Sequence, residues 1–407
     1  MKNILLMAAV ACLAFSCNKK SKSDPTNTEK VQTAVDDVRK NLSEALGMDY
    51  PSISVLIQTP AEKIFVSSSA AGAPAVTANT WFRFASNTKN FTGAAILNMH
   101  QDGWLDYEAK ITDTIPGTSQ TYVPATPEWA FPYHDQITIK QLLQHAAGVF
   151  DIDNDAVPGY GGQTYTEYIL NTDPGHQFST DEMVGVLTSK NLSYFAPGTG
   201  YHYSNTGYSI LAKIISRVYS SKSSTAKTYS DYMKDFIVGP NAPVPLSSVN
   251  FPILASDITL PDPHIKGTVL EPSGTTIYDE ANMSAQPGEG NGYGTMNDLN
   301  TYIRTLMKGE NVLTPATVAL MQHDVSTANA EYGLGCKHRP NLGYGHNGAR
   351  IGYLSTMLYD PATDVSVVVL LPLWDLRNGN ESFLHCFNAL TDAGYAARAA
   401  LGFPGKP

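Results

Sequence analysis

Strand-forming segments lie near both ends of this chain, and the residues between them favour helices. Near the start, SISVLIQ at 52–58 and KIFVSSS at 63–69 are two short β-rich runs that predict a hairpin. Near the end, YLSTMLYD at 353–360 and VSVVVLLPL at 365–373 predict a second hairpin. A further short strand is expected within 80–85. We therefore expect an α+β fold in which strands from both ends form one split antiparallel sheet.

Helical periodicity flanks these strands and fills the middle of the chain. Residues 28–46 carry apolar side chains at helical spacing, and another helix is expected near 380–400. FTGAAILNMHQDG at 91–103, ITIKQLLQHAAG at 137–148 and YSILAKIISRVYS at 208–220 predict further helices. Long loops rich in Gly, Pro, Tyr and Asp connect them, and loops of that length in a compact domain tend to be functional.

These elements divide the chain into two domains. Residues 30–90 and 305–407 are expected to form an α/β domain whose antiparallel sheet is flanked by the N- and C-terminal helices. Residues 91–304 are expected to form a mostly helical inserted domain with long loops. The length of 407 residues and the 43% hydrophobic content are typical of one enzyme-sized unit. A cleft where two domains meet is the usual place for a site.

The first residues predict export. MKNILLMAAVACLAFSC has an apolar stretch that is too short to span a bilayer. Residues 1–16 resemble a bacterial lipoprotein signal, which implies lipidation of Cys17 and a flexible tether over 17–29. A plain signal peptide with an incidental cysteine is the alternative. We expect the protein at the cell envelope, in the periplasm or at the outer membrane, with the lipid as its only membrane contact.

Charge and cysteine content narrow the possible partners. The formal net charge is −10 and no long basic run follows the N-terminal region, which argues against a nucleic-acid partner. Cys336 and Cys386 could form a disulfide or remain buried thiols. Because the chain has no CxxC or HExxH motif, no metal is expected, and no cofactor is implied.

The segment FASNTKNF at 84–91 places Ser86 three residues before Lys89, where an apolar helix begins. A serine there is a common helix cap, but the capping box needs Glu or Gln at the third position. Lysine cannot accept a hydrogen bond, and its charge opposes the helix dipole. A catalytic role explains Ser86 and Lys89 better than a capping role does. Burial and the positive end of the helix favour a neutral lysine, which can act as a base for the serine.

Two further motifs accompany this one. They are YSN at 203–205 and HNG at 346–348. The three motifs in this order resemble the serine β-lactamase and penicillin-binding protein superfamily. A tyrosine at the start of the second motif is a resemblance to class C β-lactamases and to related D-alanyl-D-alanine carboxypeptidases and esterases. A histidine at the start of the third motif is a resemblance to the carboxypeptidases. Two departures stand outside the motifs, Ala147 and Gly294-Thr295, where the family often has Ser and Ser-Thr.

The resemblance implies a β-lactamase/transpeptidase-like fold and a role for each motif residue. Ser86 would attack a carbonyl and form an acyl-enzyme. Lys89 or Tyr203 would take its proton, and the sequence does not decide between them. Asn205 would hold Lys89 and the substrate amide. His346 would supply positive potential or relay a proton.

The backbone near the third motif is expected to contact the substrate. The N–H of Ala349 would pair with that of Ser86 as an oxyanion hole. Gly348 would let substrate backbone approach closely, and Asn347 would also bind substrate. Lys337 and Arg339 could bind a substrate carboxylate, although a solvated basic turn is the simpler interpretation. His145 is expected to be structural, and GEGNGYG at 288–294 a tight loop.

The sequence thus predicts a serine hydrolase, most simply a D-alanyl-D-alanine carboxypeptidase-type peptidase acting on cell-wall peptides. A class C-like β-lactamase, an esterase or another amidohydrolase on the same fold remains open, because fold does not determine substrate. The expected partner is a small molecule or peptide with an acyl-D-Ala or related amide or ester. A non-catalytic binding module is disfavoured because all three motifs are intact. The oligomeric state is not predicted.

Overall fold

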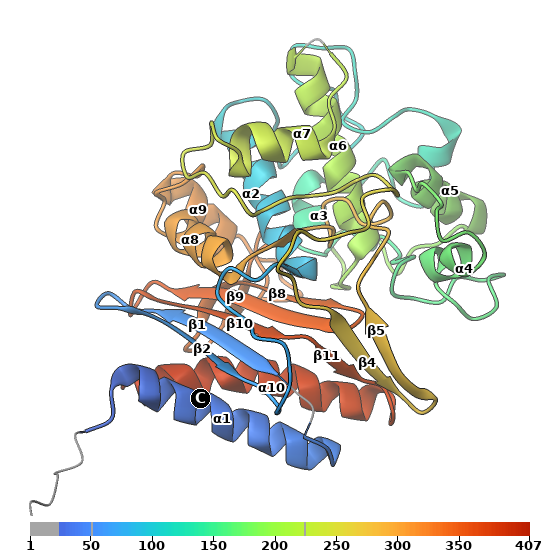
Figure 1. Ribbon diagram of the computed structural model, residues 1–407. Coiled ribbons are helices and arrows are strands. Elements are labelled where there is room, and N and C mark those ends of the chain that lie inside the picture. Colours follow the sequence, from blue (N-terminus) through green and yellow to red (C-terminus); the bar gives the residue numbers. More distant parts are fainter. Residues whose placement is uncertain (1–23, 50–51, 224) are drawn as a thin grey trace, which may run out of the picture.

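The computed structural model describes residues 24–49, 52–223 and 225–407. Its centre is a six-stranded antiparallel sheet with strand order β2-β1-β10-β9-β8-β7. Helices α1 and α10 lie along one face of this sheet, and the other helices gather on the opposite side (Figure 1). The strands are β1 Ile53–Gln58, β2 Lys63–Ser68, β7 Lys337–Arg339, β8 Gly343–Arg350, β9 Tyr353–Asp360 and β10 Val365–Leu371.

Both predicted hairpins are confirmed, and they lie side by side in the sheet. In the first, Val55 of β1 is opposite Val66 of β2, and in the second, Met357 of β9 is opposite Val368 of β10. Strand β1 also pairs with β10, with Val55 opposite Val369. The two ends of the chain are therefore joined by backbone pairing in the middle of one split sheet.

Strand β10 is buried on both faces, which explains its unbroken apolar sequence. Val367 and Val369 pack into the core beneath α1 and α10, whereas Val368 and Leu370 pack into the core of the helical layer. All four are at most 1% exposed, so burial of each contributes roughly 1.5–3 kcal/mol. The strand connects the two cores of the molecule.

The terminal helices match their predicted positions as α1, Asn27–Leu46, and α10, Asn380–Ala400. Thr26 and Glu29 form a capping box at the start of α1, and Gly47 ends the helix in a left-handed conformation. The apolar sides of both helices share one core with the sheet. The fold is thus α+β, with an antiparallel sheet flanked by N- and C-terminal helices, as expected.

The second layer is mostly helical. Its α-helices are α2 Thr88–Gln101, α3 Ile139–Leu143, α4 Tyr165–Thr172, α5 Thr180–Lys190, α6 Asn205–Ser223, α7 Tyr229–Tyr232, α8 Met296–Met307 and α9 Pro315–His323. Short 3₁₀ turns are η1 Ala85–Asn87 and η2 Pro127–Trp129, and η3 Met233–Val238 is π-helical. The predicted helix at 137–148 is wrong in extent: α3 is shorter because His145 adopts a left-handed φ of 55° just after it.

Short strands accompany these helices. They are β3 Phe82–Arg83, β4 Gly267–Glu271, β5 Gly274–Tyr278, β6 Tyr293–Gly294 and β11 Leu373–Asp375. The strand expected within 80–85 exists as β3, but it pairs with β6 and not with the main sheet. No sequence pattern predicted strands β4 and β5, which form a small sheet with β11. Helix α8 runs across the proposed boundary at residue 305, and the domain division stays a prediction.

Several sequence predictions concern residues outside this core. Cys336 and Cys386 are separate buried thiols and are not joined in a disulfide. The proposed signal peptide and the lipidation site at Cys17 lie outside the described residues. Within the part of the chain that the structure describes, no helix combines the length and apolar character needed to cross a bilayer.

Leu390→Ala should reduce the free energy of unfolding by about 2–5 kcal/mol, because the side chain is fully buried between α10 and the sheet and its loss leaves a cavity. The matched control is Leu384→Ala on the same helix, where the side chain is 44% exposed and the change should stay below about 0.5 kcal/mol. Urea unfolding followed by circular dichroism measures both. Equal losses in the two variants would contradict this packing of α10.

Candidate active site

Ser86 lies on a tight turn between β3 and α2. Ala85, just before it, has a φ of 52°, a left-handed conformation that costs a non-glycine residue about 1–3 kcal/mol. Hydrogen bonds offset this cost: Asn87 Nδ2 donates to the Phe84 carbonyl at 2.9 Å and to Ser355 Oγ at 2.8 Å. The Ser355 hydroxyl also donates to the Phe84 carbonyl. The turn is thereby fastened to β9 and holds Ser86 partly exposed.

Strand β8 passes this turn at backbone contact. A Cβ added to Gly348 would lie 2.1 Å from the Phe84 carbonyl oxygen and 3.0 Å from Asn87 Nδ2. The sequence predicts a glycine that admits substrate backbone. In the structure, the backbone that approaches Gly348 belongs to the turn carrying Ser86, and close approach of substrate backbone stays a prediction. Glycine is therefore required to seat the nucleophile against the sheet.

The same contact brings the backbones of Ser86 and Ala349 to one place. Arg350 and Tyr353 flank a two-residue turn between β8 and β9, so that pair exchanges the hydrogen bonds of the ladder. The alternation then directs the Ala349 N–H to the opposite edge of β8, which β7 leaves uncovered beyond Gly345. Because β8 contacts η1, this geometry supports the predicted oxyanion hole, which stays a prediction.

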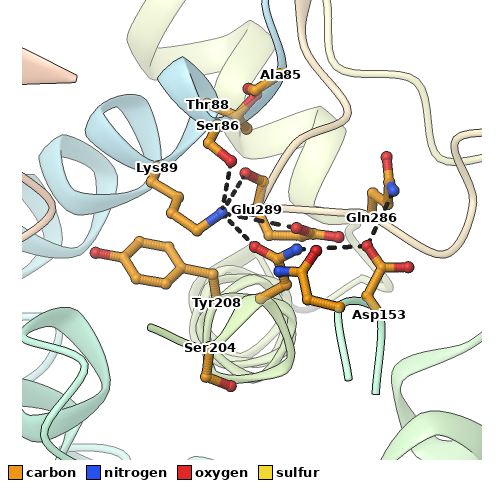
Figure 2. A network of polar contacts seen from close by, with 12 residues as sticks. Ala85, Ser86, Thr88, Lys89, Asp153, Ser204, Tyr208, Gln286 and Glu289 are labelled. Atoms are coloured by element: carbon orange, nitrogen blue, oxygen red, sulfur yellow. Dashed lines mark hydrogen bonds and ion pairs between the residues drawn. The ribbon is translucent and has the colours of Figure 1, made fainter. Parts of the chain in front are cut away.

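Lys89 is fully buried and its ammonium has three oxygen partners. Nζ donates to Asn205 Oδ1 at 2.7 Å, to the Glu289 carbonyl at 2.8 Å and to Ser86 Oγ at 3.1 Å. Figure 2 shows Nζ between Ser86 and Glu289. In the neutral amine, the two carbonyl acceptors would occupy both N–H groups and leave the lone pair directed at Ser86. Burial lowers the pKa of Lys89 to about 8, and the nearby Glu289 carboxyl acts in the opposite direction.

Asn205 begins α6 and orients Lys89. Its own backbone N–H donates to Asp151 Oδ2 at 2.9 Å, which fixes the start of the helix. Its side-chain Nδ2 donates to Asp153 Oδ2 at 3.4 Å, so the amide oxygen faces Lys89. The structure thus brings Asn205 to Lys89 as predicted, while its amide nitrogen is directed at a carboxylate.

Tyr203 completes the group around the nucleophile. The Lys89 Nζ lies 4.8 Å from the centroid of its ring, and its hydroxyl is hydrogen-bonded with Ser86. Burial raises the pKa of Tyr203 well above its usual range, so the hydroxyl keeps its proton at neutral pH. His145 packs on the ring and accepts the Ser204 N–H at 3.1 Å, which is a structural role.

The opposite pKa directions of the two candidate bases separate their roles. The pKa of Lys89 is lowered toward neutrality, whereas that of Tyr203 is raised away from it. A general base works best with a pKa near the operating pH. These directions favour Lys89 over Tyr203 as the acceptor of the Ser86 proton, and both catalytic roles stay predictions.

His346 lies on β8 and is neutral. Its Nε2 is 2.9 Å from the Tyr332 hydroxyl, and its Nδ1 contacts the Asn347 carbonyl. An Nδ1–H donor and an Nε2 acceptor satisfy both contacts. Burial lowers the pKa of His346 to about 3, with Lys89 acting in the same direction. His346 therefore does not supply positive potential at neutral pH, contrary to one of its two predicted roles.

The remaining substrate-binding predictions depend on which face of the sheet each side chain occupies. Asn347 follows His346 along the strand, so the alternation of side chains directs it to the opposite face. Lys337 pairs with Gly345, and Arg339 lies near Tyr395 of α10. These positions put both basic side chains on the face away from Ser86. The structure does not bring them to the nucleophile.

The sequence did not predict several charged residues at the site, among them Arg350 and Glu289. Arg350 shares the face of β8 with His346, and its Nη1 donates to Gln286 Oε1. Glu289 Oε2 lies 3.6 Å from Lys89 Nζ, and Glu289 is 2% exposed. Counting two residues along β8 from Gly348 could have identified Arg350. No sequence pattern pointed to Glu289, because it sits in the glycine-rich segment interpreted only as a tight loop.

That segment is held against α2 by two threonines of the helix. Thr92 Oγ1 donates to the Gly288 carbonyl at 2.6 Å, and the Gly292 N–H donates to Thr88 Oγ1 at 3.0 Å. A Cβ on Gly292 would lie 2.1 Å from the Phe84 ring. The loop is therefore tight, as predicted, and its glycines allow it to present the Glu289 carbonyl to Lys89.

The assembled groups suit nucleophilic acyl transfer: a serine hydroxyl next to a buried amine, a tyrosine hydroxyl and the predicted pair of backbone N–H groups. Among the described residues, no group of three or more His, Cys, Asp or Glu side chains is placed to hold a metal ion.

Comparison with known proteins identifies relatives of this chain. The Beta-lactamase family model matches residues 38–377. Penicillin-binding protein 4* of Bacillus subtilis (strain 168) is 32% identical over 163 residues, which cover 40% of this chain. The matched segment spans 29% of that relative's length.

Solved structures share the fold. A D-stereospecific amidohydrolase from Streptomyces sp. superposes with a TM-score of 0.65 at 18% identity, covering 87% of this chain and 97% of that one. The D-amino acid amidase from Ochrobactrum anthropi SV3 gives a TM-score of 0.62 at 21% identity, covering 84% of this chain and 92% of that one. At these identities the likeness concerns the fold alone.

Reaction of Ser86 with a fluorophosphonate should follow the ionisation of Lys89. Only the neutral amine can accept the serine proton, so the labelling rate should rise as pH increases through about 8 and then level off. Lys89→Met should reduce the rate by about 10²- to 10⁴-fold, because the side chain keeps its length but loses the base. Stopped-time labelling read by intact mass measures both. A wild-type rate independent of pH would exclude Lys89 as the base.

Gly348→Ala should slow the same labelling reaction by about 100-fold, because the new Cβ would displace the Ser86 turn from β8. The control is Gly185→Ala in α5, where a Cβ meets its nearest neighbour at 3.8 Å and no adjustment is needed. Melting temperatures of both variants distinguish displacement of the turn from general unfolding. Full reactivity in a folded Gly348→Ala protein would refute the close contact.

Proposed function

The chain belongs to the beta-lactamase family and is a hydrolase of the serine β-lactamase and penicillin-binding protein fold, and we propose that it is a D-alanyl-D-alanine carboxypeptidase-type peptidase. In this proposal it releases the terminal D-alanine from cell-wall peptides through an acyl-enzyme on Ser86. The observation that carries the proposal is the placement of Lys89. Its Nζ donates to the carbonyl oxygens of Asn205 and Glu289, and its third hydrogen-bonding direction points to Ser86.

The proposed reaction begins when neutral Lys89 takes the hydroxyl proton of Ser86 as Oγ bonds to the scissile carbonyl carbon. The carbonyl electron pair moves to its oxygen, where the N–H groups of Ser86 and Ala349 would stabilise the charge. The C–N bond then breaks as Tyr203 donates its proton to the leaving nitrogen and regains one from Lys89. Water then attacks the resulting ester as neutral Lys89 takes one of its protons. The departing serine oxygen receives that proton from Lys89, which restores Ser86 and releases the acyl group as a carboxylic acid.

Three observations support a cell-wall peptide as the substrate. The sequence predicts export to the envelope, where such peptides occur. Histidine opens the third motif, which resembles the carboxypeptidase branch. A penicillin-binding protein is among the relatives by sequence. A penicillin has the same kind of acyl carbonyl, so acylation by β-lactams is also expected, and the rate of deacylation decides whether the protein is a β-lactamase.

A second candidate is an amidase that acts on amides of D-amino acids. A peptide ending in D-Ala-D-Ala has a free carboxylate, but Lys337 and Arg339 are directed away from Ser86. Arg350 is already paired with Gln286. The Asp153 carboxyl makes the local potential more negative, which favours a substrate with an amino group over one with a carboxylate. The fold is shared with a D-amino acid amidase.

A substrate panel separates these functions. We expect release of D-alanine from an acyl-D-Ala-D-Ala peptide to exceed turnover of nitrocefin, of D-amino acid amides and of nitrophenyl esters. Ser86→Ala should abolish all turnover and any covalent β-lactam adduct, whereas Ser273→Ala, at an exposed serine in the turn between β4 and β5, should retain both. Preferred cleavage of D-amino acid amides would select the amidase. An adduct that persists in Ser86→Ala would exclude Ser86 as the nucleophile.

A further inference from the structure

Three carboxyl groups lie close to Lys89 and are absent from the motifs. Asp151 and Asp153 come from the loop before α4, and Glu289 comes from the loop beside α2. Figure 2 shows Glu289 between Lys89 and Asp153, with Gln286 beyond. All three carboxyl groups act on Lys89 and favour its charged form. The number of hydrogen bonds that each carboxyl group accepts indicates whether that group can carry a negative charge.

Asp151 is fully buried but well supplied with donors. Its Oδ1 accepts the backbone N–H groups of Asp153 and Asn154 at 3.1 and 3.2 Å. Its Oδ2 accepts the Asn205 N–H at 2.9 Å and Asn154 Nδ2 at 2.8 Å. Burial raises the pKa of Asp151 to about 6, and these donors act in the opposite direction. Asp151 can therefore remain ionised inside the protein.

Asp153 also has donors on both oxygens. Thr166 Oγ1 donates to its Oδ1, while Gln286 Nε2 and Asn205 Nδ2 donate to its Oδ2 at 3.1 and 3.4 Å. A carboxylic acid in this position would lose part of these contacts, since its own proton would face donors. The arrangement fits an ionised Asp153.

Glu289 has no such support. Its Oε2 lies 3.6 Å from Lys89 Nζ, and its Oε1 is buried without a hydrogen-bond donor in the described part of the chain. The carboxyl of Asp153 lies within hydrogen-bonding contact of the Glu289 carboxyl. Two ionised carboxylates would repel each other there, and neither could donate. One proton placed on Glu289 removes the repulsion and provides the missing hydrogen bond.

We propose that Glu289 is protonated in the resting enzyme, donates its proton to Asp153, and acts as a positioning residue that keeps Lys89 available as a neutral base. This inference rests on the proposed roles of Ser86 and Lys89. An ionised Glu289 next to Lys89 would hold the amine as an ammonium, which cannot accept the serine proton. The carboxyl pair carries one negative charge, sufficient to stabilise the ammonium once it forms.

The surrounding charges agree with this assignment. The charged or titratable groups coupled to Glu289 are Lys89 of α2, Tyr203 before α6, Asp151 and Asp153 of the loop before α4, and Arg350 of β8. Burial raises the pKa of Glu289 well above its usual range, and Asp153 adds to this effect while Lys89 opposes it. The second cation, Arg350, donates to Gln286 and so does not provide the donor that Glu289 Oε1 lacks.

The test compares two variants of Glu289 in the full-length protein. Glu289→Gln keeps a donor toward Asp153 and adds no charge, so the midpoint of the pH profile for fluorophosphonate labelling should not move. Glu289→Met has similar length but no donor, so the rate should fall about tenfold to a hundredfold, and glutamine should recover most of that loss. A midpoint shifted to lower pH in Glu289→Gln would show an ionised Glu289 and overturn the proposal. Wild-type behaviour of both variants would also overturn it.

Infrared spectroscopy detects the proton without any reaction. At neutral pH the difference spectrum between wild type and Glu289→Gln should contain the carbonyl band of a protonated carboxylic acid. The exposed Glu280→Gln is the control and should give no such band. If the Glu289→Gln variant is folded and the difference spectrum lacks this band, the shared proton is refuted. Because this measurement does not need Ser86, failure of the proposed function would leave its result interpretable.

Discussion

A lysine amine without contact to water is the condition on which the rest of this site depends. An unpaired ammonium in a protein interior is very unfavourable, so the protein must supply acceptors or neutralise the group. Here three separate segments supply them: η1 contributes Ser86, α6 contributes Asn205, and the loop beside α2 contributes the Glu289 carbonyl. The helical layer can be understood as the structure that holds these acceptors around one nitrogen. The low pKa of Lys89 follows from the same burial.

The sheet positions the turn that carries Ser86. Pairing of β1 with β10 joins the two ends of the chain, and β9 and β8 continue the sheet from β10. Ser355 of β9 and Gly348 of β8 then fix the turn of Ser86 by a hydrogen bond and by backbone contact. The nucleophile is therefore positioned by residues more than 250 positions later in the sequence. Long-range strand pairing is what makes a local serine and lysine pair chemically useful.

The sequence was informative where short-range physics decides. Hairpins, the terminal helices and the Ser86 and Lys89 pair follow from periodicity, turns and capping, all of which act over a few residues. It was uninformative where strand register decides. Lys337 and Arg339 are near the third motif in sequence, yet pairing with Gly343 and Gly345 turns them to the other face. Glu289 could not be identified, because its importance comes from contacts with segments far away in the chain.

The two-residue turn between Arg350 and Tyr353 gives the site an evolutionary constraint. Because side chains alternate along β8, inserting or deleting one residue in this hairpin would exchange the faces of His346 and Asn347 and would move Gly348 away from Phe84. Homologous proteins can lengthen most surface loops freely. In this hairpin, only insertions or deletions of an even number of residues would keep each side chain of β8 on its face. Variation in acyl-group preference should therefore accumulate in the loops around β8 and not in the strand.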